Sequence, residues 1–476
     1  MAIRARLVAP PPAPEREWQW HSLKSTSIKA STLFSGDRRM EAETYLTDGY
    51  GVRLAMEAKT GWVRFSEIAD ASAPPRIKQI LVSPEYGVPY LNTSQVFDVR
   101  PKPRKWLSME KTVKGEARLV KAGTILVMAS ATVGRAIVAT KAHENNVISH
   151  HFMRINPRDA ELTGWIYAYL RSPQASAMMT SSQYASVIRH IEPHHLGMLP
   201  IPSVSPEIAQ AFAAKVADIV TLRNDAAEKT HLAEAKFSEA VGPIVPRGKQ
   251  EGFSMSMLGL NGRRRRLEAA YHAPAVQSIV SAFKKSQRLE ELSNGVWWGN
   301  RFKRSYGDGG VPYLSADDVF TTNPHEIKNI LVDHDDGHEK LFVKQGWLVM
   351  ACSGQIYGMN GSTMIATQWH ENAVFSHDMI RIVPNGEARP GFLLTALTHP
   401  VLGRPLLIRE AYGTSIPHLD PDDVASFPVV RLSKKQEDEI ADLSEDAAER
   451  QARAEVLERE LAEEAGEVIS EFLTRR

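Results

Sequence analysis

The sequence contains one cysteine in 476 residues, Cys352. One thiol cannot form an intramolecular disulfide, and this composition is typical of proteins that fold in a reducing compartment. The chain also lacks an apolar run of the roughly 18–20 residues that a membrane-spanning helix needs. No apolar segment of a secretory signal is found in its first residues, MAIRARLVAPPPAPEREW. These absences predict a cytoplasmic protein that does not bind a membrane.

Sequence signatures of catalysis are also absent. The chain has no G-x-x-x-x-G-K-[ST] phosphate loop, no glycine-rich loop after a strand that would hold S-adenosylmethionine, and no Asn/Asp-Pro-Pro-Tyr/Phe stretch. No carboxylate pair with a lysine appears at the spacing of metal nucleases. Cys352 lies in a strand-like run, and we interpret it as a small buried residue. We therefore predict a protein without catalytic residues, cofactor or metal of its own.

The formal net charge is +1, but the charges are unevenly distributed. Residues 206–240 hold 4 Lys and Arg against 6 Asp and Glu, and residues 434–476 hold 7 against 14. The remaining residues therefore carry a net positive charge. A basic body with two acidic segments is compatible with a polyanionic partner, and equally with two solvated helices enriched in glutamate.

The pentapeptide GVPYL occurs twice, at residues 87–91 and 310–314. Chance does not explain this recurrence, because further blocks repeat in the same order at an offset that drifts only from 223 to 228. The matched blocks are RRMEAETY with RRRLEAAY, GWVRFSEIAD with SQRLEELSNG, LVKAGTILVMAS with LFVKQGWLVMACS, HENNVISHHFMRINP with HENAVFSHDMIRIVP, and YASVIRHIEPHHLGMLPIP with YGTSIPHLDPDDVASFPVV. The chain is therefore two copies of a unit, each a module of about 170 residues followed by a long helix.

Both modules show the same local patterns. GTILVMAS and GWLVMACS follow a turn and predict short buried strands. TGWIYAYLRSP and PGFLLTALTHP predict short helices that end before a proline. We expect each module to be mixed α and β, with a sheet core closed by small helices.

Two segments have the period of long amphipathic helices. The first covers residues 206–240 and starts with a proline after Ser205 as its cap, and the second starts at Ser433. Each carries a narrow apolar stripe, which an antiparallel pair of helices can bury. At 1.5 Å per residue, ~33 residues form a rod of roughly 50 Å. Pseudo-twofold symmetry then places the two modules at opposite ends of the rod.

The expected fold class is α+β, with two tandem homologous mixed α/β modules whose helices pair as an antiparallel coiled coil. The predicted segments are an N-terminal extension (1–37), a first module (38–205), a central helix (206–241), a linker (242–262), a second module (263–433) and a C-terminal helix (434–476). Two similar modules on a stiff spacer suit a ligand with dyad symmetry. Duplex DNA is such a ligand, with successive major-groove faces about 34–36 Å apart.

Candidate DNA contacts lie mainly where the two copies differ, because base contacts specify and phosphate contacts position. Arginine is prominent among them, since its guanidinium can donate two hydrogen bonds to guanine or to phosphate. In the first module the candidates are Arg76, Lys78, Lys102, Arg104, Lys105, Thr132, Arg135, Tyr184 and Arg189. In the second module they are Trp297, Trp298, Asn300, Arg301, Lys303, Arg304, Gln355, Tyr357, Tyr412 and His418. Each stretch can also be a solvated surface loop, and the basic run at 263–266 can be a phosphate clamp or a solvated helix start.

Histidines also repeat between the copies, which pair His143 with His370, His150 with His377, and His190 with His418. Their rings could hold a metal, contact DNA, or be satisfied by the backbone. The short paired spacing of zinc sites is missing, and we favour the structural role.

The order module–helix–module–helix, with GVPYL and a GTILVM or GWLVM strand in each module and HLDP…FPVV before the helix, resembles the specificity (S) subunit of type I restriction–modification enzymes. The resemblance extends from about residue 30 to the C terminus. It implies that each module is a target recognition domain that reads one half of a bipartite DNA site. It also implies that the coiled coil sets the spacing and docks methyltransferase subunits, expected to be two, which would bind the S-adenosylmethionine. A restriction or translocase subunit is a further candidate partner in such an anti-phage defence complex.

Other functions remain open from the sequence. The same duplicated fold could serve as a protein-interaction scaffold or as a standalone DNA-binding regulator. A self-contained modification enzyme is disfavoured by the missing motifs.

Overall fold

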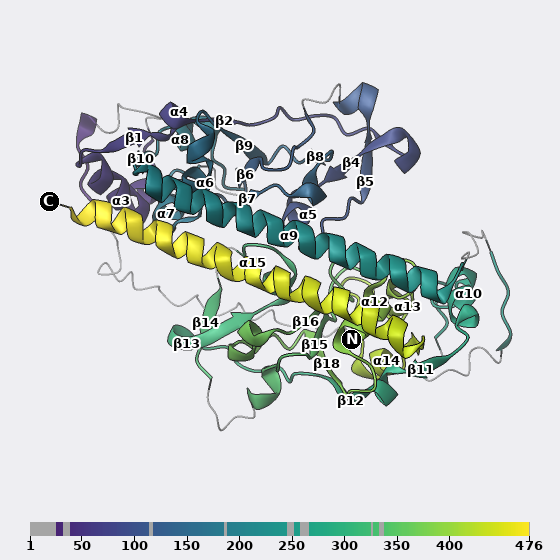
Figure 1. Ribbon diagram of the computed structural model, residues 1–476. Coiled ribbons are helices and arrows are strands. Elements are labelled where there is room, and N and C mark those ends of the chain that lie inside the picture. The colour runs from purple at the N-terminus through teal and green to yellow at the C-terminus, as the bar shows by residue number, and fades with distance from the viewer. Residues whose placement is uncertain are drawn as a thin grey trace, which may run out of the picture.

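The structure, a computed structural model, describes residues 25–31, 39–113, 118–184, 188–244, 252–257, 266–324, 327–332 and 338–475. Helices and sheets occur in both halves of the chain, which confirms the prediction of a mixed α and β fold. Two long helices lie side by side across the middle of the molecule, with the two halves of the chain on either side (Figure 1). No helix among the described residues is long and apolar enough to cross a membrane. Most of the predicted N-terminal extension and much of the predicted linker lie outside the described residues.

The first half contains these elements in chain order: α2 (Ala42–Leu46), α3 (Asp48–Glu57), β1 (Trp62–Arg64), α4 (Phe65–Ile68), β2 (Ala69–Ser72), β3 (Leu81–Val82), β4 (Gly87–Leu91), α5 (Thr93–Phe97), β5 (Lys105–Ser108), β6 (Ile125–Met128), β7 (Ala136–Val138), β8 (Val147–Ile148), β9 (Phe152–Pro157), α6 (Thr163–Arg171), α7 (Pro173–Ser181), α8 (Pro193–Gly197), β10 (Pro200–Pro202) and the long helix α9 (Pro206–Val241).

The second half contains these elements: α10 (Pro274–Ala282), β11 (Ser286–Arg288), β12 (Ser293–Trp298), β13 (Tyr306–Leu314), α11 (Ala316–Phe320), β14 (Lys328–Ile330), β15 (Leu348–Ala351), β16 (Thr363–Ile365), β17 (Val374–Phe375), β18 (Met379–Pro384), α12 (Pro390–Thr398), α13 (Arg404–Ile408), α14 (Pro421–Ala425), β19 (Pro428–Val430) and the long helix α15 (Lys434–Thr474).

The sheets of the two halves correspond to one another. An antiparallel four-stranded sheet has the order β2-β9-β6-β7 in the first half and β12-β18-β15-β16 in the second. A second sheet has the order β3-β5-β4-β8 in the first half and β14-β13-β17 in the second. The two-stranded pairs β1-β10 and β11-β19 also correspond. The sequence repeat is therefore a repeat of strand order and direction.

The repeated pentapeptide forms β4 and the last five residues of β13. Its fourth residue pairs in parallel with a valine in both halves, Tyr90 with Val147 and Tyr313 with Val374. All residues of β6 and β15 are buried, as predicted for GTILVM and GWLVM. These repeated stretches build the scaffold.

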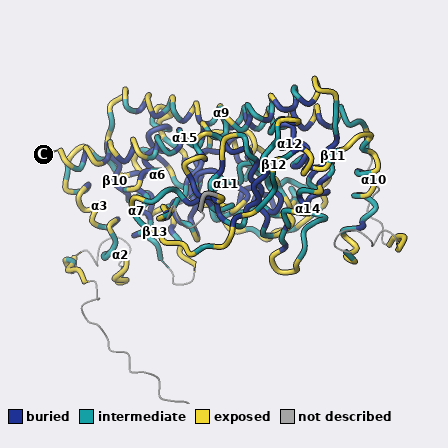
Figure 2. Tube along the Cα trace, turned by 90° about the horizontal axis from the view of Figure 1, so that it is seen from below, coloured by how far each residue is buried: buried dark blue, intermediate teal, exposed yellow. Residues whose placement is uncertain are grey.

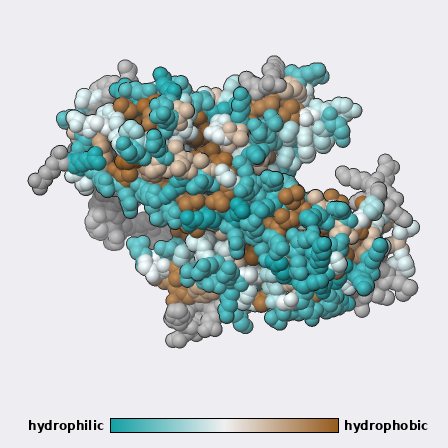
Figure 3. Space-filling model, viewed as in Figure 1, coloured by the Kyte–Doolittle hydropathy of each residue, from teal (hydrophilic) through white to brown (hydrophobic). Residues whose placement is uncertain are grey.

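The long helices begin at the predicted caps. Ser205 accepts a hydrogen bond from the backbone of Ile208 at the start of α9, and Ser433 forms a capping box with Gln436 at the start of α15. Ion pairs between the helices show that they run antiparallel, among them Lys236–Glu439 and Lys229–Asp446, both at 2.7 Å, and Lys215–Glu464. The face of the helix pair that looks away from the modules is largely hydrophilic (Figure 3).

Each half has its own large core, and both long helices contribute to both cores. The first core combines the strands and α6 with Phe212 of α9 and Leu461 of α15. The second combines the strands and α12 with Phe237 of α9 and Ile440 of α15. Buried residues therefore continue from one half into the other beneath the helix pair (Figure 2).

Two glycines set how closely each half approaches its long helix. A Cβ added to Gly164 of α6 would lie 2.3 Å from the backbone nitrogen of Ala213 in α9. One added to Gly391 of α12 would lie 2.4 Å from the backbone oxygen of Ala441 in α15. Ala213 and Ala441 are 228 residues apart and occupy equivalent positions of the two long helices, so the two contacts are equivalent.

The two halves also meet directly, just after α5 and α11. Asp98 and Thr321 form an isolated antiparallel bridge, and they are separated by 223 positions, the offset of the repeat. Reciprocal backbone hydrogen bonds flank this bridge: Val99 N to Phe320 O at 3.0 Å, and Thr322 N to Phe97 O at 2.6 Å. A pseudo-twofold axis therefore passes between Asp98 and Thr321.

Candidate nucleic-acid interface

A polar cluster forms in each half where the chain leaves β6 or its counterpart β15. We call it the Ser–His cluster. In the first half it consists of Ser130, His150, His151 and His190, and in the second of Ser353, His377, Asp378 and His418. The serine forms an isolated backbone bridge to the last histidine in both halves. These residues come from three separate segments, and the fold brings them together twice in the same arrangement.

The side chains of the two clusters are bonded differently. Ser130 Oγ lies 2.6 Å from His151 Nδ1 in the first cluster. In the second, Ser353 Oγ lies 3.0 Å from His418 Nδ1 and donates to Asp378 Oδ1 at 3.3 Å. His151 and Asp378 occupy equivalent positions, so this substitution changes the hydrogen-bonding character of the cluster. A neutral imidazole can both donate and accept, whereas an ionised carboxylate only accepts.

The backbone beside each serine takes a left-handed conformation. Ala131 has φ 65° and the equivalent Gly354 has φ 116°. An alanine in this region is unfavourable, and such strain is concentrated at functional sites. The residue after the serine therefore has a positive φ in both halves, although in the first half this residue is an alanine, for which the conformation is unfavourable.

Cations lie beside both clusters. In the second half, Arg304 Nη2 is 3.5 Å from His377 Nδ1, and the guanidinium lies 5.2 Å from the centre of the Tyr313 ring. Burial lowers the pKa of His377, and Arg304 and Arg301 lower it further against the opposing effect of Asp378. In the first half, burial lowers the pKa of His150, with His151 and Arg76 as smaller causes. Burial also lowers the pKa of His151, with His190 and Arg76 as smaller causes. These imidazoles are therefore neutral at pH 7 and able to read donors and acceptors.

Several predicted contacts lie in or next to these clusters. Tyr184 and Tyr412 form backbone bridges to His190 and His418. The hydroxyl of Tyr184 donates to Glu192 at 2.7 Å, and this bond raises the pKa of Tyr184 to about 12. Two more predicted contacts are bonded within their own half. Arg189 is ion-paired with Glu43 at 2.7 Å, and Gln355 donates to the backbone oxygen of Ser415 at 2.9 Å.

Other predicted contacts are exposed on neighbouring strands and loops. The exposed ones are Arg76, Lys78, Lys105, Trp298, Asn300, Arg301, Lys303 and Arg304. Trp297 instead packs edge-on against Trp347, with ring centres 5.4 Å apart. The hydroxyl of Thr132 lies 3.1 Å from the sulfur of Met128. The exposed residues are available to a partner, whereas Trp297 and Thr132 are occupied within their own module.

Four predicted contacts lie at the junction of the two halves and not at a Ser–His cluster: Lys102, Arg104, Arg135 and Tyr357. The guanidinium of Arg135 stacks 3.8 Å from the centre of the Phe97 ring and donates to the backbone oxygens of Thr322 and Asn323 at 2.6 and 2.7 Å. Its guanidinium therefore joins the two halves. Lys102 and Arg104 face Tyr357 of the other half, with Arg104 5.8 Å from the Tyr357 ring centre.

The basic run at 263–266 is described only at Arg266. Its Nη1 and Nη2 donate to the backbone oxygens of Glu410 and Ala411, both at 2.9 Å. The equivalent Arg39 makes the matching bond to Ser182 O at 2.7 Å. Arg266 is thus neither a phosphate clamp nor part of a helix start, because its guanidinium anchors the chain to the module.

The repeated histidines divide into two kinds. His143 and His370 are buried, and their Nδ1 atoms accept from the backbone nitrogens of Thr140 and Thr367 at 3.1 and 3.0 Å. This confirms the structural role for that pair. Within the described ranges, no group of three or more His, Cys, Asp or Glu side chains is placed to hold a metal ion.

Although the loops that begin at Ser130 and Ser353 were among the candidates from the sequence, His151 and Asp378 were not selected as DNA contacts. Their signal was present, since SHH and SHD recur at the same position of the repeat. Recurrence alone, however, does not separate a residue that builds the scaffold from one that presents a polar group.

No family model matches the sequence, and neither does any curated protein. Solved structures do match. The S subunit of a type I restriction–modification system from M. genitalium is 14% identical, with 87% of this chain and 94% of that chain covered and a TM-score of 0.35. The HsdS subunit from Thermoanaerobacter tengcongensis is 13% identical, with 87% and 97% covered and a TM-score of 0.26. The chain is thus loosely similar, over most of its length, to specificity subunits of type I restriction–modification systems.

Proposed function

We propose that this chain is the non-catalytic DNA-specificity subunit of a type I-like methyltransferase or restriction complex. Each half is a target recognition domain that reads one half of a bipartite site. The observation that carries the proposal is the pair of equivalent Ser–His clusters with unlike polar groups, His151 in one and Asp378 in the other. Equivalent positions give both domains the same docking geometry, and unlike groups give them different base preferences. An aspartate accepts from the amino group of cytosine, whereas a neutral histidine has a wider choice of partners.

The antiparallel helix pair is the proposed spacer, a coiled coil that fixes the distance between the half-sites. The 36 residues of α9 extend over about 54 Å. This exceeds one helical repeat of DNA, about 34–36 Å, so the half-sites would be separated by a gap of unread base pairs. The pseudo-twofold axis presents two similar outer surfaces, which suits two methyltransferase subunits that carry the S-adenosylmethionine.

Methylation sequencing tests this proposal. The chain is co-expressed with its cognate methyltransferase subunit in a host that lacks both, and the methylated motif is determined. We expect a gapped motif with two unlike halves that disappears when this chain is omitted. His151→Asp and Asp378→His should each change one half of the motif and leave the other half intact.

Lys121→Gln, an exposed substitution that precedes β6 whereas Ser130 follows it, is the matched control and should leave the motif unchanged. An ungapped motif, or a motif that both swaps leave intact, would contradict the assignment. Co-purification with proteins other than a methyltransferase, without a DNA footprint, would favour the interaction-scaffold alternative.

A further inference from the structure

A cavity of about 550 Å³ lies where the two halves meet the helix pair. Its walls come from both halves and both long helices, including Arg104, Arg404, Thr230 of α9 and Gln451 of α15. This volume lies within the range of small-molecule sites, roughly 300–1,000 Å³. Equivalent positions of the two copies differ around this cavity, and the differences explain why the space is open.

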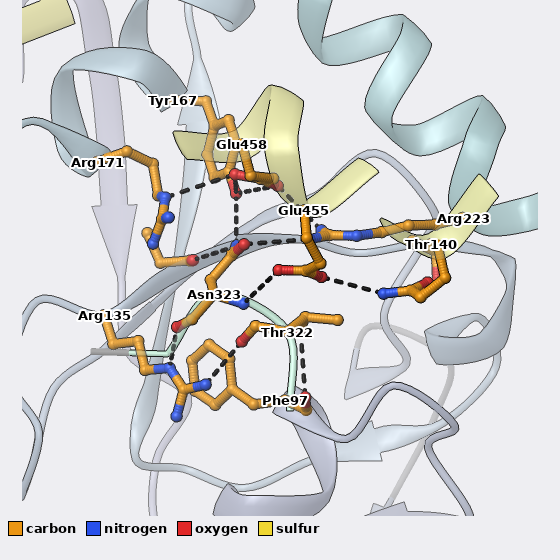
Figure 4. Close-up of polar contacts among 12 residues, drawn as sticks. Phe97, Arg135, Thr140, Tyr167, Arg171, Arg223, Thr322, Asn323, Glu455 and Glu458 are labelled. Carbon is orange, nitrogen blue, oxygen red and sulfur yellow. Dashed lines mark hydrogen bonds and ion pairs between the residues drawn. The ribbon is translucent and has the colours of Figure 1, made fainter. Parts of the chain in front are cut away.

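On one side of the pseudo-twofold axis, a buried polar network fills the equivalent space (Figure 4). Glu458 Oε1 accepts from Arg223 Nη1 and from the hydroxyl of Tyr167, both at 2.9 Å. Arg223 Nη2 donates to Asn323 Oδ1 at 3.0 Å and to Glu455 at 3.2 Å. Arg171 lies 3.5 Å from the other oxygen of Glu458, so the buried charges are paired on this side, although the Nε atoms of Arg171 and Arg223 have no hydrogen-bond partner among the described residues.

On the other side, the equivalent positions hold smaller or uncharged residues. The offset of 228 along the helices places Ala227, Thr230 and Gln451 where the network has Glu455, Glu458 and Arg223. The module positions of Tyr167 and Arg171 hold Leu394 and Thr398. All five replacements line the cavity. The cavity therefore opens where these replacements leave space, and Arg223, Glu455 and Glu458 of the network border it as well.

The open side carries an excess of positive charge. Arg100, Lys102, Arg104 and Arg404 all line it, and we call them the cation cluster. Burial, with Arg100 as the next cause, lowers the pKa of Lys102 to about 8 although much of this residue is exposed. Burial also lowers the pKa of Arg404, and the nearby Arg104 and Arg100 lower it further. The four cationic side chains therefore lie close enough together for their mutual repulsion to lower the pKa of Lys102 and of Arg404.

Acidic groups in the cavity wall offset part of this charge. Glu234 is ion-paired with Arg100 at 2.5 Å. The carboxyl of Asp98, whose pKa burial raises to about 6 against the opposing effect of Arg104, is largely ionised at pH 7. Glu455 and Glu458 also line the cavity and are ion-paired with Arg223. Asp318 accepts from the backbone and hydroxyl of Ser315 as a helix cap. In the described part of the chain, neither Lys102 Nζ nor the guanidinium of Arg104 has a hydrogen bond or ion pair.

A further cation, Arg459, also lines the cavity. The guanidinium of Arg459 stacks 3.7 Å from the centre of the Trp369 ring. Its Nη2 is buried without a hydrogen-bond partner among the described residues. A buried charged donor that is left unbonded costs free energy, so this atom also favours an anionic or acceptor-rich occupant.

We propose that this cavity binds a small polyanion of the phosphate class, with its charged groups between Arg100, Lys102, Arg104 and Arg404. Such a ligand would supply negative charge beside Thr230, the position equivalent to Glu458. It would touch both halves and both helices, and so stabilise their relative placement. The inference goes beyond DNA reading and does not depend on it.

Isothermal titration calorimetry of the full chain with tripolyphosphate and with ATP tests the proposal, with adenosine as the uncharged probe. At about 0.1 M salt, where surface charges are screened over roughly 10 Å, we expect saturable binding of one phosphate-bearing probe per chain and no binding of adenosine. Lys102→Gln combined with Arg104→Gln should weaken the affinity at least about tenfold. Thr230→Glu places a carboxylate at the position equivalent to Glu458 and should weaken the affinity similarly. Lys121→Gln should leave the affinity unchanged.

Three results would overturn the proposal. The first is the absence of saturable binding. The second is an affinity that neither the double substitution nor Thr230→Glu changes. The third is displacement of tripolyphosphate by duplex DNA, which would assign the cation cluster to the DNA backbone. Retention of both the probe and a bipartite footprint would show that the cavity and the DNA interface are separate sites.

Discussion

Replacing Arg223 by methionine removes the cation at the centre of the buried network that joins the two halves to the helix pair. Arg223 is 6% exposed and Glu458 is 1% exposed, so the remaining carboxylate cannot be rehydrated in place. Breaking a buried ion pair by removing one partner costs about 3–5 kcal/mol. Glu458 keeps the hydroxyl of Tyr167 at 2.9 Å and Arg171 at 3.5 Å, so we expect the lower end, about 3 kcal/mol.

A double-mutant cycle separates the loss of the interaction from the cost of the unpaired charge. Glu458→Met alone leaves Arg223 with Glu455 and should also destabilise the chain. Arg223→Met with Glu458→Met removes both charges, so its cost should fall below the sum of the single costs by at least about 2 kcal/mol. Gln451→Met, at the position equivalent to Arg223, removes the hydrogen bond from Gln451 Nε2 to Glu455 at 3.0 Å but leaves no buried charge unpaired, so it should cost about 1 kcal/mol.

The free energy of unfolding is measured by urea titration followed through tryptophan fluorescence, since the chain contains nine tryptophans. The cycle is run at one pH and salt concentration for all five proteins. Additive single costs would show that Arg223 and Glu458 are not coupled. A cost for Arg223→Met no larger than that of Gln451→Met would refute the reasoning that a buried charge is left unpaired.

Three further predictions concern DNA binding, pH dependence and helix capping. Arg301→Ala with Arg304→Ala should weaken duplex binding in a titration at moderate salt and reduce the slope of log affinity against log salt by about 2, and an unchanged affinity would count against these contacts. The pKa of Asp98 is raised to about 6 by burial. The folded state therefore binds this proton more tightly than the unfolded state, and stability falls as pH rises from about 4 to about 6. Asp98→Asn should raise the free energy of unfolding at pH 7 by up to about 3 kcal/mol and leave it nearly unchanged below pH 4, and equal effects at both values would contradict this. Ser433→Ala removes the cap of α15 and should cost about 1 kcal/mol in urea unfolding, whereas Lys434→Ala at the adjacent exposed position should cost less.

The local structure was largely predictable because it depends on nearby residues. The long helices begin at Ser205 and Ser433 because a side-chain oxygen can accept from a backbone nitrogen three residues later, and that relation is visible in the sequence. The strands β6 and β15 were equally visible, because short apolar runs after a glycine are typical of buried strands.

The candidate interface was predictable only in part. Arg76, Arg301 and Arg304 are exposed, as expected for residues that differ between the copies. Arg135 also looked like a contact from its loop, but its guanidinium stacks on Phe97 and donates to Thr322. A loop arginine has the same sequence signal whether it meets solvent or a distant backbone oxygen, so only the packing of the halves distinguishes the two.

The duplication of the chain, the starts of its long helices and the burial of β6 and β15 were predictable from the sequence alone. These features follow from periodicity, capping and recurrence, all of which act over a few residues or between matching blocks. Tertiary structure alone decided that Asp98 meets Thr321 on a pseudo-twofold axis, and that a charged network fills one side of this axis while a cavity lined by cations remains on the other. The reason is that the two copies differ at a few positions whose partners lie more than two hundred residues away in the sequence. A repeat shows which positions are equivalent, but it does not show which residues contact each position.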